Sequence, residues 1–307
     1  KTVVGLLIAD WRRRKYRRPV LYACPTQQLV HQVATVAHRE GMPHVMLIGS
    51  HNSWPPVEKS KYDGADALGL TTYSSIFNTA PKVGAPGTIV FDDAHAGEQY
   101  VADSWAVTVH RGRHRDAYDA CLKAVRPALS GMFASRMEHD SPDVRARTDV
   151  QLVVPLRRPK MAEAINRALS NLPDGSSAWW AWNTIRPGLA SCLVYVSWRD
   201  ILVRPFIPPT SENEPFSGAE QRIYLSATPG HAGELERSFG RQQVERLLLP
   251  DGRSPRSGRR FVVFSSLGMD PGDREGWQGS RAGDFQRPRS QHGESAQPSR
   301  MASSSQR

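Results

Sequence analysis

Two adjacent carboxylates and a histidine follow an apolar run at residues 87–95, which read GTIVFDDAH. If this run is a parallel strand, its carboxyl end is where open α/β sheets bind ligands. Asp92 could hold Mg²⁺ there, directly or through water, and Asp93 could polarise the water that attacks a terminal phosphate. Aspartate is also a good helix N-cap after a strand, so a purely structural role is the alternative.

Lys1 and Thr2 stand directly before a second apolar run, VVGLLIAD at 3–10. A lysine followed by a threonine at a helix start is how a phosphate-binding loop of the GxxxxGK[ST] kind ends. Backbone N–H groups of such a loop hold the phosphates, the lysine reaches the β and γ phosphates, and the hydroxyl holds Mg²⁺. Alone the pair has little specificity, because any helix can begin this way.

Small hydroxyl side chains follow a third candidate strand, in RIYLSATPG at 222–230. From the end of a strand, Ser226 and Thr228 can hydrogen-bond a neighbouring loop. An ordinary turn, punctuated by Pro229 and Gly230, is the alternative.

The order of the polar pieces is more specific than any one of them. The chain reads KT at its start, then ACPTQQLVHQ at 23–32, GLTTYSSI at 69–76, VFDDAH at 90–95 and LSAT at 225–228. This series resembles motifs I, Ia, the TxT-like nucleic-acid contact, II and III of the first RecA-like domain of the superfamily 2 DEAD/DEAH-box helicases. The resemblance covers residues 1–100 and 220–265.

The resemblance implies an ATP-dependent helicase or translocase, with ATP and Mg²⁺ as cofactors. Lys1 would bind phosphate, Thr2 and Asp92 would hold Mg²⁺, and Asp93 stands where the family has its catalytic glutamate. His95 would act beside Asp93 in the catalytic site.

The remaining motif residues would serve the nucleic acid. By resemblance, His95 and the segment Ser226, Ala227 and Thr228 would couple the nucleotide state to the grip on DNA or RNA. Residues of the other two motifs, Pro25, Thr26 and Thr72, would contact the backbone of a single strand. Hydroxyl groups can position a strand there without reading its bases.

Three departures from the family pattern affect the expected activity. Asp93 is one methylene shorter than glutamate, and a small misplacement of a catalytic group can be costly in rate. The glycine half of the phosphate loop is not in the sequence before Lys1, and we expect a second RecA-like domain with its arginine finger to be missing. We therefore expect a fragment that is inactive by itself.

Alternating strands and helices predict the fold. Apolar segments at 19–26, 44–50 and 87–95 read as strands, and 67–78 reads as a strand that turns into a short helix. Strands that alternate with helices favour a largely parallel sheet with right-handed crossovers. We expect an α/β fold, a RecA-like P-loop domain with a mainly helical insertion between the DEAH-like and SAT motifs. The expected parts are a first RecA-like portion at 1–110, the insertion at 111–190, the rest of the RecA-like domain at 191–257, the start of a second one at 258–267, and a disordered tail at 268–307.

Composition narrows the class of partner. The formal net charge of +10 fits a polyanion, although an arginine-rich soluble protein is an equal alternative. Residues 268–307 contain no Leu, Ile or Val, so they cannot bury enough apolar area to offset the entropy of ordering.

Cysteine and apolar content give further expectations. The three widely spaced cysteines form neither a disulfide framework nor a CxxC pattern, and only Cys24 lies between motifs I and II, where iron–sulfur helicases carry four. We therefore expect no iron–sulfur cluster. No apolar run approaches the roughly 20 residues of a membrane span, and we expect a cytoplasmic protein.

Two other functions stay open. One is a motor that translocates on duplex for a restriction or remodelling complex, and the other is a non-catalytic nucleic-acid-binding remnant. Of two further segments, WWAW at 179–182 could stack on bases but is more typical of a core, and the basic run at 12–18 is more typical of a solvated helix end.

Overall fold

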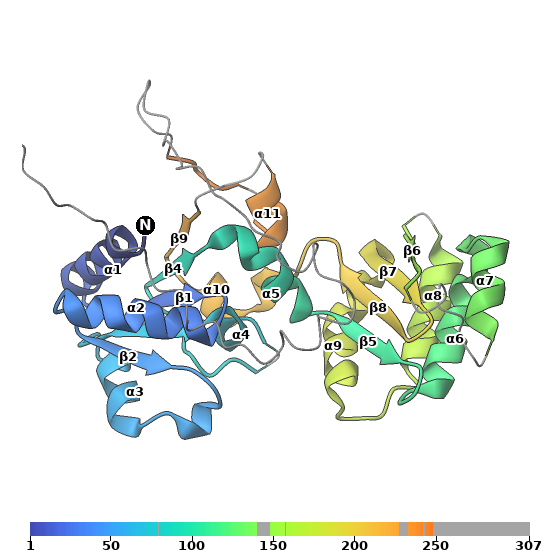
Figure 1. The fold of residues 1–307 in the computed structure, drawn as a ribbon, viewed down its shortest axis with the longest axis horizontal. Helices are drawn as coiled ribbons and strands as arrows, with labels where there is room; N and C mark the ends of the chain where they lie inside the picture. The colour runs from blue at the N-terminus through green and yellow to red at the C-terminus, as the bar shows by residue number, and fades with distance from the viewer. Residues whose placement is uncertain (79, 140–147, 157, 227–232, 242, 248–307) are drawn as a thin grey trace, which may run out of the picture. The chain divides into compact units, whose positions relative to one another are not determined.

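The computed structural model describes residues 1–78, 80–139, 148–156, 158–226, 233–241 and 243–247 (Figure 1). These residues hold a five-stranded sheet and a four-stranded sheet. The expected strand at 258–267 and the tail at 268–307 lie outside the described residues.

The five-stranded sheet is parallel throughout, with the order β2-β3-β1-β4-β9. Its strands are β1 Val20–Cys24, β2 His44–Leu47, β3 Leu68–Thr72, β4 Thr88–Asp92 and β9 Gln221–Leu225. β1, β3 and β4 are buried at every position, because helices cover both faces of a parallel sheet. The predicted α/β class with a mostly parallel sheet is confirmed.

Seven α-helices accompany this sheet in the described chain. They are α1 Thr2–Tyr16, α2 Gln27–Arg39, α3 Pro56–Asp63, α4 Tyr73–Ile76, α5 Gly97–Asp103, α10 Glu214–Ser217 and α11 Glu234–Ser238. Short 3₁₀ turns occur at His51–Ser53, Ala94–Ala96 and Thr210–Glu212.

Each face of the parallel sheet has its own core. On one face, Leu6 of α1 and Val30 of α2 pack with the strand residues Tyr22, Leu70 and Val90. On the other face, side chains of α3, α4 and α10 pack with the alternate strand residues, such as Leu21 and Phe91. Consecutive strand residues therefore enter different cores, since strand side chains alternate between faces.

The basic run at the end of α1 is partly structural. Arg13 is only 5% exposed, and its guanidinium pairs with Asp10 at 2.7 Å and donates to the Ala65 carbonyl at 2.7 Å. Arg12 donates to the Thr88 hydroxyl at 2.6 Å. The remaining residues of the run, 14–18, are exposed, as expected of a solvated helix end, whereas Arg12 and Arg13 join α1 to its neighbours.

The four-stranded sheet is antiparallel, with the order β5-β8-β7-β6. Its strands are β5 Val107–His110, β6 Val150–Val153, β7 Cys192–Ser197 and β8 Asp200–Pro205. Around it lie α6 Arg115–Val125, α7 Gly131–Glu138, α8 Pro159–Leu169 and α9 Ser177–Ile185, with 3₁₀ turns at Arg126–Ala128 and Arg186–Ser191 (Figure 1). α6 packs against α8, and α9 packs against β5.

This second sheet is the main difference from the expected architecture. The four helices at 111–190 agree with a mainly helical insertion, but β5 and β6 were not foreseen. Strands β7 and β8 pair here and not in the parallel sheet, although they fall in the stretch 191–257 that was assigned to the RecA-like part. The reason is that β5 and β6 have four residues each, which is too short for a clear period-2 signal.

No helix of the described chain is both long and apolar enough to cross a membrane.

Candidate nucleotide and nucleic-acid site

The carboxyl ends of the parallel strands bring distant residues to one edge of the sheet. Lys1 caps the N-terminus of α1, and Asp92 is the last residue of β4. The Lys1 Nζ lies 3.2 Å from the Asp92 Oδ1 and 2.9 Å from the Asp93 Oδ1, although Lys1 and Asp93 are 92 positions apart in the chain. The fold thus places a cation against the carboxylate pair.

The environment of this cluster is half enclosed. The Asp92 side chain is 10% exposed, whereas the side chains of Lys1 and Asp93 are about one-third exposed. Burial by itself lowers the pKa of Lys1, but the hydrogen bond to Asp93 and the charge of Asp92 outweigh burial, so the pKa is raised. Lys1 therefore remains a cation that offsets the repulsion between the two carboxylates.

The donor atoms suit a magnesium nucleotide. Mg²⁺ in phosphate sites is usually held by one or two protein oxygens together with phosphate oxygens. The Asp92 carboxylate and the Thr2 hydroxyl supply such oxygens, and Lys1 at the start of a 15-residue helix supplies a cation and free backbone N–H groups for phosphate. In the described part of the chain no three His, Cys, Asp or Glu side chains form a metal cluster of their own, and this kind of site does not need one.

Asp93 adopts an unusual backbone conformation. Its φ of 59° and ψ of 47° lie in the left-handed region, which aspartate tolerates better than most residues. Although it precedes the 3₁₀ turn Ala94–Ala96, its side chain makes no capping hydrogen bond. The Asp93 side chain therefore does not act as a helix cap, which was the structural alternative.

His95 links Asp93 to the end of β9. Its Nδ1 lies 3.3 Å from the Asp93 Oδ1 and 3.3 Å from the Ser226 Oγ. The structure thus brings Ser226 to the carboxylate cluster from a strand far along the chain. Ala227 and Thr228 lie outside the described residues.

Two tyrosines lie at the cluster, where the sequence offered no reason to expect them. Tyr22 of β1 has its hydroxyl beside Asp92 and Thr2, and burial, with the Asp92 charge, holds its pKa well above the usual range. Tyr73, the first residue of α4, donates from its hydroxyl to the Asp92 carbonyl oxygen at 2.8 Å. The feature of the sequence that could have drawn attention to them is a hydroxyl-bearing aromatic residue within or directly after a buried strand.

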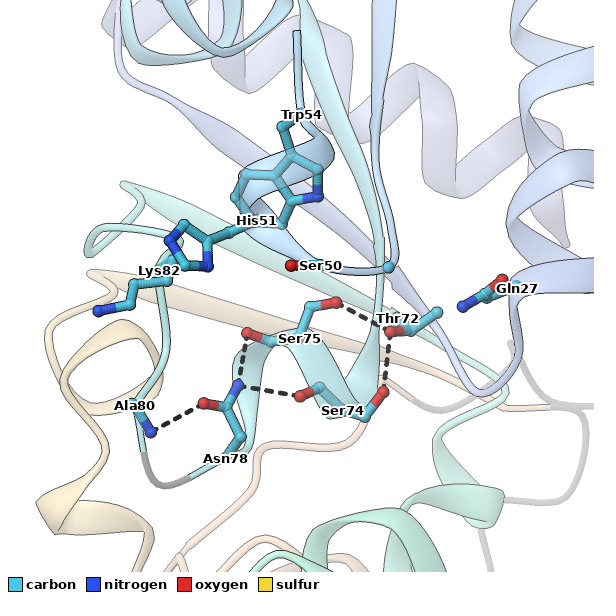
Figure 2. A pocket seen from close by; sticks show the side chains of 11 residues that line it. Gln27, Ser50, His51, Trp54, Thr72, Ser74, Ser75, Asn78, Ala80 and Lys82 are labelled. Atoms are coloured by element: carbon cyan, nitrogen blue, oxygen red, sulfur yellow. Dashed lines mark hydrogen bonds between the residues drawn. The ribbon is translucent and has the colours of Figure 1, made fainter. Parts of the chain in front are cut away.

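A cavity of about 270 Å³ lies at the same sheet edge, beside Thr72 (Figure 2). Its lining residues share hydroxyl, amide and basic groups, and no carboxylate is among them: Gln27, Gly49, Ser50, His51, Trp54, Thr72, Ser74, Ser75, Asn78, Ala80 and Lys82. Figure 2 shows Gln27 and Lys82 on opposite sides, with Thr72 and Ser75 between them. Such a lining suits an anion with several oxygen atoms.

The three residues expected to contact nucleic acid differ in their settings. Thr72 lines the cavity, and its Oγ1 lies 3.0 Å from the hydroxyls of both Ser74 and Ser75. Thr26 is exposed but also caps α2, where its hydroxyl accepts from the Leu29 N–H at 3.3 Å. Pro25 is buried beside it and does not line the cavity.

The aromatic segment 179–182 divides between core and surface. Trp182 is buried, and its indole N–H donates to the Asn166 amide oxygen at 2.8 Å. Trp180 is 53% exposed and packs edge-on against Trp179. The core interpretation holds for Trp182, and base stacking by Trp180 stays a hypothesis.

The three cysteines are buried, unpaired and far from reactive. Burial raises the pKa of the Cys24, Cys121 and Cys192 thiols to about 12. The expected absence of an iron–sulfur cluster stays a prediction.

Comparisons with known proteins find only distant likenesses. No family model matches the chain, and no curated protein matches it. Among solved structures it is similar to Xpd4 of S. tokodaii, with 14% identity and a TM-score of 0.41, over 73% of this chain and 50% of that one. It is also similar to an apo form of XPD, with 13% identity and a TM-score of 0.45, over 79% and 51%.

A third likeness, to an XPD helicase, has 11% identity and a TM-score of 0.39, over 78% of this chain and 56% of that one. The chain thus spans about half the length of these structures. Likenesses of this size decide neither a family nor an activity, so the function depends on the geometry of the site.

Proposed function

We propose that this chain is the first RecA-like part of an ATP-dependent nucleic-acid helicase or translocase of the DEAD/DEAH-box type. The observation that carries the proposal is the contact of Lys1 with Asp92 and Asp93, which joins the helix start to the end of β4. A lysine at a helix N-terminus facing a strand-end carboxylate is the arrangement that phosphate and Mg²⁺ require together.

Each residue of the cluster has a separate role in this proposal. Lys1 would bind phosphate oxygens, while Thr2 and Asp92 would hold Mg²⁺. Bound Mg²⁺ would neutralise the negative charge that develops during phosphoryl transfer. Asp93, whose side chain is 34% exposed and so reachable by water, would orient the attacking water and accept its proton.

His95 would position Asp93 and connect it to the strand end at Ser226. The 3.3 Å distances from its Nδ1 to the Asp93 Oδ1 and to the Ser226 Oγ support this role. Ala227 and Thr228 remain part of the same proposal through their place in the motif.

The nucleic acid would lie across the other strand ends, with Pro25, Thr26 and Thr72 at its backbone. Support comes from the cavity beside Thr72, whose described lining has no carboxylate, and from the net charge of +10. Neutralising phosphates releases condensed counterions, so we expect binding that weakens steeply with salt.

A non-catalytic protein that binds nucleotide and nucleic acid is the second candidate. The observation that favours it is Asp93, which is shorter than the family's glutamate and is engaged by Lys1 at 2.9 Å. Both candidates predict nucleotide binding, and they differ only in hydrolysis.

Thermal unfolding of the chain with and without Mg–ADP tests the nucleotide site. A ligand that binds only the folded state at a hundred times its Kd stabilises by about 2.7 kcal/mol. We expect the unfolding midpoint of the wild type to rise and that of Asp92→Asn to stay unchanged. The matched control is Asp63→Asn, an exposed carboxylate paired with Lys59, which should respond as the wild type does.

An equal shift in Asp92→Asn, or none in the wild type, would contradict the nucleotide site. Hydrolysis of ATP in the presence of polyuridylate or oligothymidylate then separates the two candidates. Activity that is lost in Asp93→Asn supports the motor, and binding without hydrolysis supports the second candidate.

A further inference from the structure

Tyr73 occupies the junction between the carboxylate cluster and the cavity. It is fully buried, and its hydroxyl donates to the Asp92 carbonyl oxygen at 2.8 Å. Its ring packs edge-on against Phe91, Tyr100 and Phe239 at centroid distances of 5.4, 6.0 and 6.3 Å. These rings hold it from three different segments of the chain.

The residues on either side of Tyr73 line the cavity. Thr72 and Ser74 both contribute to its wall, and their hydroxyls lie 3.0 Å apart (Figure 2). Tyr73 itself does not line the cavity, but its two chain neighbours do, while its side chain reaches the carboxylate cluster.

We propose that Tyr73 is a positioning residue that makes the Asp92 end of β4 respond to a polynucleotide bound in the cavity. The inference rests on the proposed function, because it requires a polynucleotide at Thr72 and a nucleotide at Asp92. Tyr73 itself contacts neither ligand and acts through the Asp92 backbone.

Packing makes this connection stiff. A ring clamped by three aromatic neighbours cannot absorb a shift of its own backbone by rotating, because interiors are close-packed and transmit displacement. A phosphodiester that draws the hydroxyls of Thr72 and Ser74 toward the cavity would therefore move the Tyr73 hydroxyl and the carbonyl to which it is bonded.

The hydroxyl is suited to a permanent link. A tyrosine hydroxyl carries its proton at physiological pH, so the group stays a donor to the Asp92 carbonyl oxygen. Coupling between two ligand sites is reciprocal, so polynucleotide should change nucleotide affinity by the same factor as nucleotide changes polynucleotide affinity.

The test measures that factor in Tyr73→Phe, which removes only the hydroxyl. A fluorescent Mg–ADP analogue is titrated with and without oligothymidylate, and the reverse titration checks reciprocity. Coupling factors are typically about 5–150, and we expect the wild type in that range and Tyr73→Phe within about twofold of no coupling. Each ligand alone should bind the variant as tightly as the wild type.

Tyr62→Phe is the matched control. Tyr62 lies in α3 and is only 2% exposed, and its buried hydroxyl makes no hydrogen bond with the described residues. The Tyr62→Phe variant loses the same hydroxyl oxygen from an equally buried ring that does not contact Asp92. Its coupling factor should therefore equal that of the wild type. Tyr62→Phe controls for the loss of a buried hydroxyl atom, whereas Tyr73→Phe also removes the hydrogen bond to the Asp92 carbonyl oxygen.

The outcomes separate this inference from the proposed function. Unchanged coupling in Tyr73→Phe, or no coupling in the wild type that binds both ligands, overturns the inference alone. Failure of the wild type to bind either ligand overturns the proposed function as well. If Tyr73→Phe does not fold, hydrogen exchange on the wild type decides: oligothymidylate alone must change protection at residues 92–94, and no change overturns the inference.

Discussion

The two sheets bury their strands differently. In β4 of the parallel sheet every residue is buried, whereas β7 of the antiparallel sheet alternates between buried and half-buried positions. The parallel strands all leave the sheet at one edge, so Lys1, Asp92, Ser226 and Thr72 gather there. In the antiparallel sheet neighbouring strands have their carboxyl ends at opposite edges, so the residues that follow these strands do not gather at one edge.

The difference shows what each sheet can do. When helices cover both faces of a parallel sheet, ligands can reach it at the carboxyl ends of its strands, where residues from distant segments meet. The antiparallel sheet keeps one face partly open, with Leu152, Tyr195 and Leu202 in one cross-strand row. That row is a surface feature and brings no carboxylate or cation pair together.

The largest effect on stability should separate two aromatic residues, one in each sheet. Phe91 has no exposed surface and stacks with Tyr224 at 5.4 Å. Phe91→Ala should cost about 3–5 kcal/mol of unfolding free energy, because the cavity cannot collapse. Tyr195→Ala should cost roughly 1 kcal/mol, since its ring is half-buried and its main partner is Arg204. Urea unfolding followed by fluorescence measures both, and equal costs would break the distinction between the sheets.

Adjacent positions within one strand give the next largest effect. Ile89 and Val90 of β4 are both fully buried, so alanine at either should cost about 2 kcal/mol or more. In β6, Val153→Ala should lower the unfolding free energy by about the same amount. Leu152 is 48% exposed, so Leu152→Ala should lower it by less than about 0.5 kcal/mol. The same urea series tests the pattern. A costly Leu152→Ala would mean that the second face is covered.

The smallest effect concerns the ion pairs of Glu98, one of which reaches from α5 to a strand of the antiparallel sheet. Glu98 of α5 accepts two hydrogen bonds from Arg237 at 2.8 and 2.6 Å and lies 3.8 Å from Arg204 of β8. The hydrogen bond from Arg237 holds the pKa of Glu98 below its usual 4.5. A depressed folded-state pKa stabilises the fold above the unfolded value, and that stability is lost as the pH falls through the folded value.

Thermal unfolding from neutral pH to well below 4.5 measures this contribution. The wild type should lose more stability over that window than Glu98→Gln, which cannot titrate. Glu138→Gln is the control within the antiparallel part, because the pair of Glu138 with Arg126 is exposed and should contribute less. Identical pH profiles for the wild type and Glu98→Gln would show that the bridge adds nothing.

Local signals in the sequence predicted the elements that local physics controls. The apolar run before Asp92 is β4, and the first residues of the parallel strands β1 to β3 also lie in the apolar segments expected for them. The alternation of such elements predicted the parallel sheet. The nearness of Lys1 to Asp92 was an expectation of the motif order, since no local pattern contains a distance.

The sequence could not predict the pairings that only distant contacts create. β5 pairs with β8 across more than ninety residues, in the register Val107↔Val203, and nothing within four residues of β5 indicates that partner. Arg13 reads as one more solvated cation until Asp10 and Ala65 enclose it. The Tyr73 hydrogen bond depends on where β3 and β4 end relative to each other.

By itself, then, the sequence determined the strands of the parallel sheet and which residue types stand at their ends. Those properties follow from hydrophobic period, caps and turns, which act over a few residues. Tertiary structure decided which strands share a sheet, which arginines are buried, and that Tyr73 lies between the cavity and Asp92. These depend on packing among residues far apart in the chain, because burial and hydrogen bonding are settled only when the partner segment is in place.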